Sequence, residues 1–367
     1  MKVALVHDWI TNIGGAEKVL ETIYEIFPES DIYTLFYEKD KIKNIDIKKI
    51  KTSFLQKLPF INKIYRYYLP IYPLIIENFN LENYDVIISS SHAVAKGIIC
   101  YPEQTHICYC HTPMRYIWDM YYQYIENLGI IKRILFSIIS HYLRIWDVSS
   151  SHRVDFFIAN SKFVARRIEK YYNRKATVIY PPVDVLKFNV EENKENYFLT
   201  VSRFVPYKRV DIIVSTFKKL KNQKLVIIGD GPEYNKIKKL ACNCKNIEIL
   251  GYKDFNTMRK YLEKAKAFIY TAKEDFGISI VEAQACGTPV IAYGYGGASE
   301  TVIHKKTGIL FYQQNEKALI EAIKLFENIK DKFNPFEIRK HAEKFSKENF
   351  IKKFKDTVNK FLEIKLQ

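Results

Sequence analysis

Short runs of β-branched residues alternate with segments of helical period along the whole chain. The pattern starts with a predicted strand at residues 2–7, a loop at 8–15 and an amphipathic helix at 16–27, which Pro28 ends. Repetition of this order predicts an α/β fold with parallel sheets that helices cover on both faces.

Twin prolines divide the predicted strands into two sets. Pro181 and Pro182 follow a strand and precede a polar stretch. We therefore expect two Rossmann-like domains, residues 1–183 and 184–345, and a final amphipathic helix, 346–367, that packs on another part of the chain. The first set comprises 2–7, 86–89, 106–110, 156–159 and 176–180, and the second comprises 197–202, 224–229, 247–251, 267–271 and 290–292.

The composition is that of a folded protein with an excess of positive charge. Of 367 residues, 48% are hydrophobic and 27% are charged, which excludes a disordered chain and a small stapled module. The 57 Lys and Arg residues exceed the 41 Asp and Glu residues by 16, a surplus that attracts phosphorylated ligands, nucleic acid or an anionic bilayer. No uncharged apolar run reaches the ~18 residues that span a bilayer, and no signal peptide is recognisable, so we expect a cytoplasmic protein.

The six cysteines include two Cys-x-Cys pairs, a spacing that does not suit structural zinc. We predict buried free thiols in a reducing compartment. The residues are Cys100, Cys108, Cys110, Cys242, Cys244 and Cys286.

Glycines or cations follow the first strand of each predicted domain. Gly14 and Gly15 stand where backbone N–H groups can approach an anion, although a mere tight turn has the same residues. In the second domain Ser202, Arg203 and Lys208 follow the strand, so the two cations are candidates for binding a diphosphate, with a solvated charge cluster as the alternative. At an effective dielectric near 20, a charge about 4 Å from another is worth ~4 kcal/mol.

Two glutamates, Glu274 and Glu282, frame the most informative stretch. Gly277 lets the backbone pass close to a ligand, and a helix predicted to begin near Ile278 directs N–H groups towards an anion. Glu282 lies one turn inside that helix, where a carboxylate accepts hydrogen bonds from paired hydroxyls such as those of a ribose. Two surface glutamates beside a helix start would give the same pattern.

The spacing of Glu274 and Glu282, with Phe276 and Gly277 between them, resembles the signature of the family 4 retaining glycosyltransferases of GT-B fold. Two further segments, 110–116 and His7 to Trp9, are most similar to GDP-mannose-dependent mannosyltransferases of O-antigen and capsule assembly. The resemblance implies two domains that face each other across a cleft and a last helix that returns to the first domain. It also includes Gly14, Gly15, Ser202, Arg203, Lys208, the turn at 229–232, Gly251, Gly296 and Gly297.

Carried to matching positions, the family pattern implies a donor site and a catalytic set. Arg203 and Lys208 would hold the donor diphosphate, and Glu282 would bind the ribose. Glu274 would hold sugar hydroxyls, and His111 would face the transferring sugar. The other implied donor contacts are Gly14, Gly15, Ser202, Tyr252 in the nucleobase pocket, Phe276, Gly277, Ile278, Ile280 and Val281.

Three residues near predicted strand ends in the first domain have alternative interpretations. His111 follows an apolar strand, where a hydrogen-bonded core histidine is common, but we favour a functional role. His92 follows another strand end and has a weaker case for a role on the acceptor side. Asp8 either contacts the acceptor or caps its loop.

Two segments mix basic and apolar side chains as membrane-interface surfaces do: residues 51–79 and residues 130–146. Core helices with basic outer faces would give the same pattern. We favour peripheral contact with an anionic membrane, at the inner face of the plasma membrane, because acceptors in the resembled family are often lipid-linked.

Together, these features predict a retaining hexosyltransferase that moves mannose from GDP-mannose to a saccharide or polyprenyl-linked acceptor. No metal or other cofactor is expected, because cations and helix N-termini already do what a divalent ion does for a diphosphate. A UDP-sugar-dependent enzyme of the same fold is the main alternative, and an epimerase or phosphorylase is another. A nucleic-acid-binding protein would use the positive charge, but the sequence contains no DNA or RNA motif, and no nucleic acid partner is expected.

Overall fold

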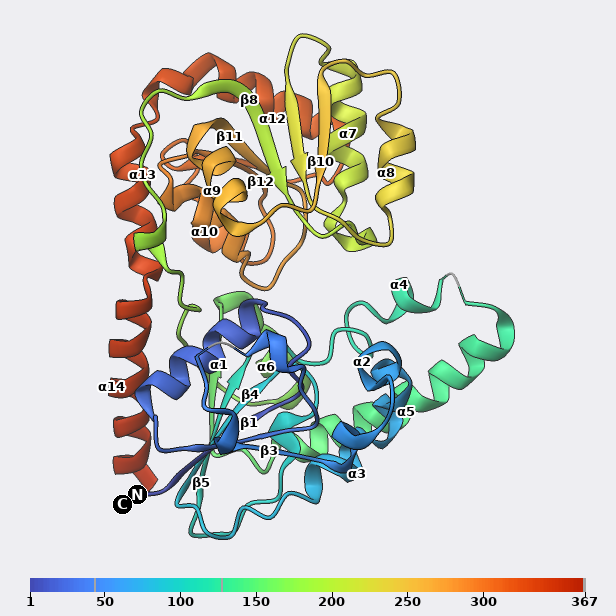
Figure 1. Cartoon of the computed structure of the whole chain (residues 1–367), viewed down its shortest axis with the longest axis vertical. Helices are drawn as coiled ribbons and strands as arrows, with labels where there is room; N and C mark the ends of the chain where they lie inside the picture. Colours follow the sequence, from blue (N-terminus) through green and yellow to red (C-terminus); the bar gives the residue numbers. More distant parts are fainter. Residues whose placement is uncertain (43, 127, 366–367) are drawn as a thin grey trace. The chain divides into compact units, whose positions relative to one another are not determined.

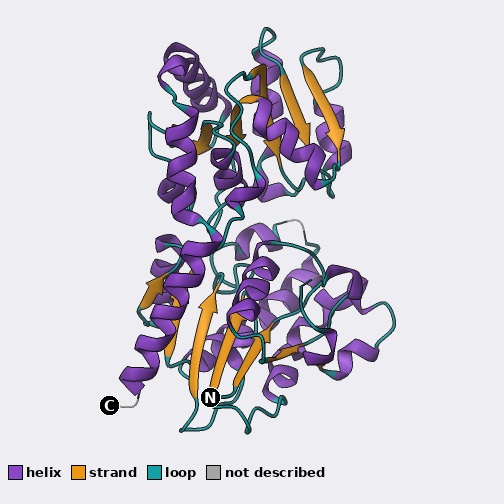
Figure 2. Cartoon of the chain, turned by 60° about the vertical axis from the view of Figure 1, so that its left-hand side comes forward, coloured by secondary structure: helices purple, strands orange, loops and turns teal. Residues whose placement is uncertain are grey.

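The computed structural model describes residues 1–42, 44–126 and 128–365, and the chain divides into two units. The first unit comprises Met1–Pro182 with Phe350–Gln367, and the second comprises Val183–Asn349. Each unit contains one parallel sheet with helices packed against it (Figure 1, Figure 2). No helix in the described ranges is long and apolar enough to cross a bilayer.

The first strand of the chain, β1, is a central strand in the sheet of the first unit. Its described strands have the order β3-β2-β1-β4-β5-β6-β7, and neighbouring strands are parallel. The chain builds outward from β1 to β3 and then returns to the other side of β1 with β4, which makes β1 and β4 the topological switch point. The strands are β1 (Val3–His7), β2 (Asp31–Thr34), β3 (Ile50–Thr52), β4 (Val86–Ser91), β5 (Thr105–Cys110), β6 (Phe156–Ala159) and β7 (Ala176–Val178).

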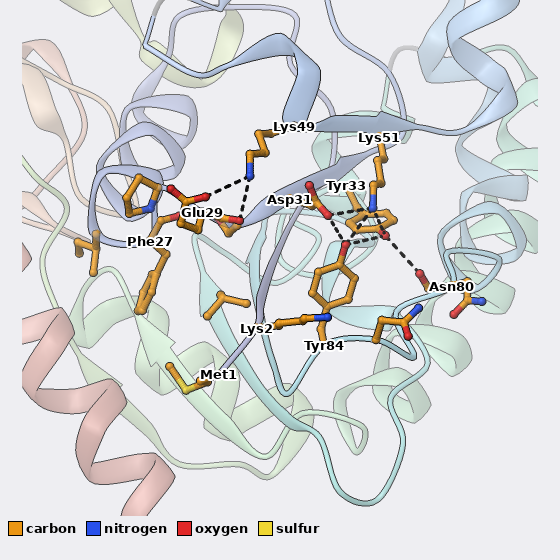
Figure 3. A pocket seen from close by; sticks show the side chains of 15 residues that line it. Met1, Lys2, Phe27, Glu29, Asp31, Tyr33, Lys49, Lys51, Asn80 and Tyr84 are labelled. Atoms are coloured by element: carbon orange, nitrogen blue, oxygen red, sulfur yellow. Dashed lines mark hydrogen bonds and ion pairs between the residues drawn. The ribbon is translucent and has the colours of Figure 1, made fainter.

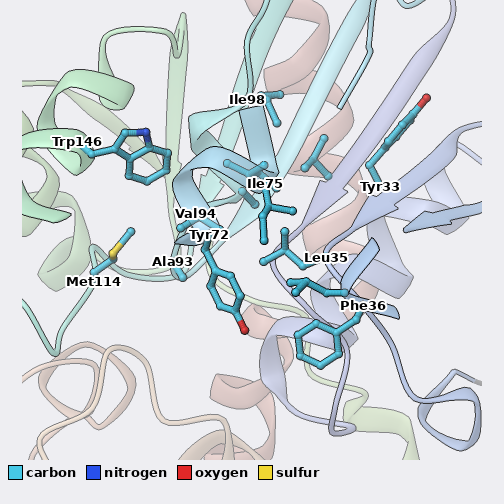
Figure 4. Packing of buried hydrophobic residues seen from close by; sticks show 14 of the residues in the cluster. Tyr33, Leu35, Phe36, Tyr72, Ile75, Ala93, Val94, Ile98, Met114 and Trp146 are labelled. Carbon is cyan, nitrogen blue, oxygen red and sulfur yellow. The ribbon is translucent and has the colours of Figure 1, made fainter. Parts of the chain in front are cut away.

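Both faces of this sheet are buried. Successive side chains of β1 point to opposite faces, so they pack in two different clusters. Val3 and Leu5 pack with α1 (Gly15–Ile26) and α14 (Lys347–Lys365). Ala4 and Val6 pack on the other face with α3 (Tyr72–Glu77) and α5 (Ile130–Ser151), where Tyr72 and Trp146 lie in the cluster of Figure 4. The other helices of this unit are α2 (Ile61–Ile64), α4 (Tyr121–Ile125) and α6 (Lys162–Tyr172).

The second unit repeats the same plan. Its described strands have the order β10-β9-β8-β11-β12-β13, so the switch point lies between β8 and β11. The strands are β8 (Glu195–Val201), β9 (Leu225–Ile228), β10 (Ile247–Gly251), β11 (Ala265–Tyr270), β12 (Val290–Tyr293) and β13 (Gly308–Phe311). The helices are α7 (Val210–Lys219), α8 (Tyr234–Leu240), α9 (Phe255–Lys264), α10 (Ile278–Ala285), α11 (Ala298–Thr301), α12 (Glu316–Ile329) and α13 (Pro335–Ala342). Together the two sheets form the α/β architecture that the alternating pattern predicts.

The last helix, α14, carries an apolar stripe into the first unit. Its buried residues, Phe350, Phe354, Val358 and Phe361, share a cluster with side chains of β1 and β5. The Phe361 ring stacks on Phe156 with 4.3 Å between centroids. This packing gives the amphipathic pattern at the end of the chain its physical reason.

Several local predictions differ from the structure. The sequence pattern did not indicate β2, β3 or β13, each of only three or four residues. The segment 51–79 contains 3-10 turns and the short helices α2 and α3, and its buried residues are Leu55, Ile61, Tyr72, Pro73, Ile75 and Ile76. Of the cysteines, Cys108, Cys110 and Cys286 are buried thiols as predicted, whereas Cys242 is exposed and the other two are partly exposed.

Candidate functional site

An ion pair lies at the switch point of the second sheet, in the loops that follow β8 and β11. Lys208 Nζ is 2.6 Å from Glu274 Oε1, and it donates to Tyr270 Oη at 3.1 Å. The side chains of Lys208 and Glu274 are only 16% and 18% exposed. Burial lowers the pKa of Lys208, but the Glu274 carboxylate outweighs burial and holds that pKa well above its usual range. Lys208 is therefore a fixed positive charge.

The end of β11 positions Lys208. Because β8 and β11 are parallel neighbours, the loops that follow them meet at the same edge of the sheet. The hydroxyl of Thr271, directly after β11, lies 3.0 Å from the carbonyl oxygens of both Lys208 and Arg209. This contact fixes the short turn Pro206–Lys208 against the strand that leads to Glu274.

Glycines position Glu274 and the start of α10. Gly277 caps α10 with φ +86°, in the left-handed region that favours glycine. A Cβ at Gly296 would lie 2.1 Å from the Glu274 carbonyl oxygen, so only glycine allows this close approach. The next residue, Gly297, donates its N–H to the same carbonyl at 2.9 Å. The Glu274 backbone is therefore held by a neighbouring loop.

The amides at the start of α10 are not equivalent. The Ile280 N–H donates to the Gly277 carbonyl at 2.9 Å, so the implied donor contact of Ile280 is in this structure a bond within its own helix turn. Ile278 heads the first turn, where N–H groups have no partner within a helix. Val281 and Phe276 are buried, and the Phe276 ring lies 5.6 Å from that of Phe345 between centroids.

The other implied donor residues of this unit lie near the same edge without joining the ion pair. Arg203 is exposed just after β8, and the Ser202 hydroxyl donates to the Arg203 carbonyl at 3.2 Å. Glu282 is half-buried in α10. Tyr252, directly after β10, is 80% exposed. The structure thus brings Lys208 and Glu274 into contact and leaves Arg203 and Tyr252 open to solvent.

Three histidines gather at the switch point of the first sheet. Ser90 Oγ lies 2.8 Å from His111 Nε2 and 3.1 Å from His7 Nδ1, so it links the two rings. Burial, helped by the charge of His92, lowers the pKa of His7 to about 4. Burial, together with the other two histidines, lowers the pKa of His111 well below its usual value. Both rings are therefore neutral near pH 7.

Asp8 is the cap of the loop that follows β4. Its carboxylate is fully buried and accepts four backbone N–H groups at 2.6–3.0 Å, those of His92, Ala93, Val94 and Ala95. Burial raises the pKa of Asp8, but the nearby His92, 3.0 Å away through Nδ1, brings it below its usual range. Burial lowers the pKa of His92, but the charge of Asp8 and its hydrogen bond raise that pKa above its usual value. Of the two interpretations of Asp8, the structure therefore shows loop capping.

His92 is the most open member of this group. Its side chain is 27% exposed, whereas His111 is 8% exposed and His7 is fully buried. The His92 ring packs edge-on against Trp9 with 4.7 Å between centroids. Of this group, His92 is therefore the side chain that solvent reaches most readily.

The amide of Gly14 is already engaged by a carboxylate. Its N–H donates to Glu17 Oε2 at 3.1 Å, and burial raises the pKa of Glu17. Gly15 opens α1 and remains a first-turn amide. An anion at this helix start would therefore meet Glu17 before it reached Gly14.

Comparison with known proteins identifies the class of enzyme. The profile described as glycosyltransferase family 4 matches residues 13–186, and that of glycosyl transferases group 1 matches residues 184–350. The chain is a glycosyltransferase of the family 4 type with the GT-B fold. It is 29% identical over 360 residues to an uncharacterised glycosyltransferase of Methanocaldococcus jannaschii, an alignment that covers 96% of this chain and 94% of the relative.

More distant relatives have named activities. The Saccharomyces cerevisiae alpha-1,3/1,6-mannosyltransferase ALG2 is 23% identical, with 98% of this chain and 85% of the relative covered. Two solved structures share the fold. Anabaena HepE in complex with UDP-glucose has a TM-score of 0.70 and 18% identity, with 98% of this chain and 100% of HepE covered. Sucrose-phosphate synthase of Thermosynechococcus elongatus has a TM-score of 0.74 and 15% identity, with 99% of this chain and 100% of the synthase covered.

The sequence interpretation of this glycosyltransferase missed Tyr270, Ser90 and Glu17. Ser90 is opposite His7 in the pairing of β1 with β4, and Tyr109, two residues before His111, is opposite Ser90. Pairing the predicted strand ends in register would have found the link through Ser90. No sequence signal distinguishes Tyr270 from other core tyrosines, because its role depends on where Lys208 points.

A cavity of about 700 Å³ lies at the opposite, amino edge of the first sheet (Figure 3). Met1, Lys2 and Asp31 line it at the start of β1 and β2. Lys51 Nζ donates to Asp31 Oδ2 at 2.9 Å and to Tyr84 Oη at 2.9 Å, so its charge is paired. Ligands of such sheets bind at the carboxyl edge, and this cavity of the glycosyltransferase is therefore not the candidate site.

Proposed function

We propose that this glycosyltransferase transfers mannose from GDP-mannose to a saccharide or polyprenyl-linked acceptor in surface polysaccharide synthesis, with retention of anomeric configuration. The observation that carries the proposal is the Lys208–Glu274 ion pair, which lies at the switch point of the second sheet beside the start of α10. It combines a fixed cation for a diphosphate with a carboxylate for sugar hydroxyls in one place.

Leaving-group stabilisation is the main contribution of Lys208 in the proposed reaction. Negative charge develops on the β-phosphate as its bond to the anomeric carbon breaks. A preorganised ammonium about 4 Å away is worth ~4 kcal/mol at an effective dielectric near 20. Arg203 supplies a second cation from the exposed loop after β8. Glu274 keeps Lys208 charged and accepts hydrogen bonds from the sugar.

Retention follows from attack on the face that the leaving group vacates. The acceptor oxygen forms its bond to the anomeric carbon, and its proton passes to an oxygen of the departing β-phosphate. This route needs no protein nucleophile, unlike the paired carboxylates of a retaining hydrolase. The family resemblance of the Glu274 to Glu282 segment supports it.

The names of relatives support mannose, with one specific alternative. A GDP-mannose-dependent mannosyltransferase of Mycobacterium tuberculosis is 28% identical over 192 residues, 44% of this chain and 50% of the relative. A poly(glycerol-phosphate) alpha-glucosyltransferase of Bacillus subtilis is 31% identical over 198 residues, 51% of this chain and 29% of the relative. Glucosyl transfer is therefore the second candidate.

A thermal-shift panel identifies the donor. GDP-mannose, UDP-glucose and UDP-N-acetylglucosamine are compared with GDP and UDP, because a ligand at a hundred times its Kd adds ~2.7 kcal/mol of stability. We expect GDP-mannose to give the largest shift. A larger shift with UDP-glucose would favour the second candidate, and no shift with any nucleotide would contradict donor binding. Product analysis then separates transfer from epimerisation and phosphorolysis.

Replacement of Lys208 by methionine tests its role. We expect Lys208→Met to reduce kcat by about 100-fold or more, because the loss of a preorganised charge costs ~3–4 kcal/mol in the transition state. Lys245→Met, which removes an exposed lysine of the same unit, is the matched control. The double variant Lys208→Met/Glu274→Gln leaves no unpaired charge, so it should regain stability but not activity. Wild-type turnover in Lys208→Met would refute the assignment.

A further inference from the structure

Helix α5 exposes a row of large apolar side chains to solvent, in addition to the apolar residues that it buries. Six large apolar side chains at helical spacing, two of them adjacent in sequence, form one stripe on its outer face, named here the α5 ridge. They are between 42% and 83% exposed. The ridge consists of Ile131, Ile134, Leu135, Ile138, Tyr142 and Ile145. Such a stripe on a globular helix normally faces the core.

The buried side of α5 carries Leu143 and Trp146 together with polar residues, and the polar contacts fix which side of the helix faces the core. Asp147 is fully buried on that side, where it is ion-paired with the buried Lys96. Trp118 Nε1 and Tyr172 Oη each donate to Asp147 Oδ2 at 2.8 Å. Rotation of the helix would break these bonds and leave Lys96 without its partner, which is costly for a buried charge. The ridge is therefore a permanent part of the surface.

Positive charge accompanies the ridge. Lys132 and Arg133 are exposed on α5, and the single acidic residue of this helix is the buried Asp147. Trp146 Nε1 donates to Glu77 Oε1 at 2.8 Å and so ties α5 to the end of α3. The segment 47–76 before that contact contains no Asp or Glu. Its cations are Lys48, Lys57, Lys63 and Arg66, together with Lys49 and Lys51, which are ion-paired with Glu29 and Asp31. It also exposes Phe60 and Tyr67, at 71% and 84%.

We propose that the α5 ridge inserts into the headgroup region of an anionic bilayer and holds the first unit at the membrane surface. Apolar side chains flanked by Lys and Arg, with aromatic rings beside them, fit the apolar and anionic layers of such a surface. A second copy of this chain is a poorer occupant, because a two-fold interface would place Lys132 and Arg133 near the same cations. No described helix, α5 included, is long and apolar enough to cross a bilayer. In this proposal α5 lies along the membrane surface.

Vesicle flotation tests the proposal with the full chain. We expect binding to vesicles of phosphatidylglycerol and phosphatidylcholine, and weaker binding to phosphatidylcholine alone or at high salt. The variant Ile134→Ser/Ile138→Ser should bind the anionic vesicles about tenfold or more weakly, because two side chains no longer enter the apolar layer. Leu186→Ser/Phe336→Ser, which removes two exposed apolar side chains of the second unit, is the matched control and should bind like the wild type.

Three outcomes would overturn the proposal: no vesicle binding by the wild type, equal binding by the ridge variant, or equal binding to neutral and anionic vesicles. A dimer in sedimentation velocity that only the ridge variant abolishes would assign the ridge to a second copy instead. Native tryptophan fluorescence checks that the variant folds. Its nucleotide-induced thermal shift should match the wild type, so failure of the ridge and failure of the proposed donor site are separate results.

Discussion

The buried histidines of the first unit make its stability depend on pH. The unfolded chain protonates His7 near 6.5, whereas the folded chain holds its pKa at about 4 because of burial and the charge of His92. Between these values the unfolded state binds more protons, so stability is full above pH 6.5 and falls as the pH drops. His111, with its lowered pKa, acts in the same direction. His92 acts in the opposite direction, since its pKa is raised.

Replacement of His7 should remove part of this pH dependence. At pH 5, the two pKa values of His7 correspond to a loss of about 2 kcal/mol of unfolding free energy relative to pH 7. We expect the drop between pH 7 and pH 5 to be smaller by about that amount in His7→Asn. Urea unfolding followed by tryptophan fluorescence measures it, with the exposed His152→Asn as control. Parallel pH profiles of wild type and His7→Asn would contradict the burial argument.

At the scale of elements, the sequence predicted what depends on local pattern. The strand–helix alternation, the break at Pro181 and Pro182 and the amphipathic last helix all follow from periodicity and backbone chemistry. The strands β2, β3 and β13 were not predicted, although β6, β7, β9 and β12 are equally short and were, so strand length alone does not explain the difference.

In the candidate site, too, some features follow from local sequence and others depend on tertiary packing. Lys208 and Glu274 were found because strand ends and a glycine-rich helix start mark them in sequence. Their direct contact, the capping role of Asp8 and the outward apolar side of α5 depend on tertiary packing between segments distant in sequence. A helix with a basic and an apolar side gives no sign of which side the core takes, and here the buried Lys96–Asp147 pair decides it.

The apolar stripe of α14 should be a stability element of the first unit. Phe354 is fully buried among side chains of the first sheet, and its ring lies 6.4 Å from that of Tyr109 between centroids. We expect Phe354→Ala to destabilise this unit by about 3–5 kcal/mol, the usual cost of deleting a buried aromatic ring. Ile364→Ala, at a position of the same helix that is 48% exposed, is the control.

The tryptophans allow this effect to be measured in one unit. All three, Trp9, Trp118 and Trp146, lie in the first unit, so their fluorescence follows its unfolding in urea. Far-ultraviolet circular dichroism follows both units, which need not unfold together. A fluorescence midpoint that Phe354→Ala leaves unchanged would show that α14 contributes no stability to the first unit.

For the whole molecule, the excess of 16 positive charges acts in two ways, because some cations are exposed on the surface and others are buried and paired. Surface lysines raise the local concentration of phosphorylated donors and of anionic lipids, and salt screens both effects over about 10 Å at 0.1 M. A cation that is buried and paired, as Lys208 is, keeps its strength in salt. Donor affinity should therefore fall less steeply with salt than vesicle binding does.

The fixed charges of the second unit lead us to propose that turnover needs no divalent metal. A metal ion serves a departing diphosphate by neutralising its developing charge. Here Lys208, which Glu274 keeps protonated, is placed to do so together with Arg203 and the first-turn amides of α10. We expect unchanged kcat after dialysis against EDTA, with EDTA saturated by magnesium as the control for effects of the chelator itself. A loss of turnover that magnesium restores would mean that these groups do not suffice, and the role given to Lys208 would then have to be shared with a metal ion.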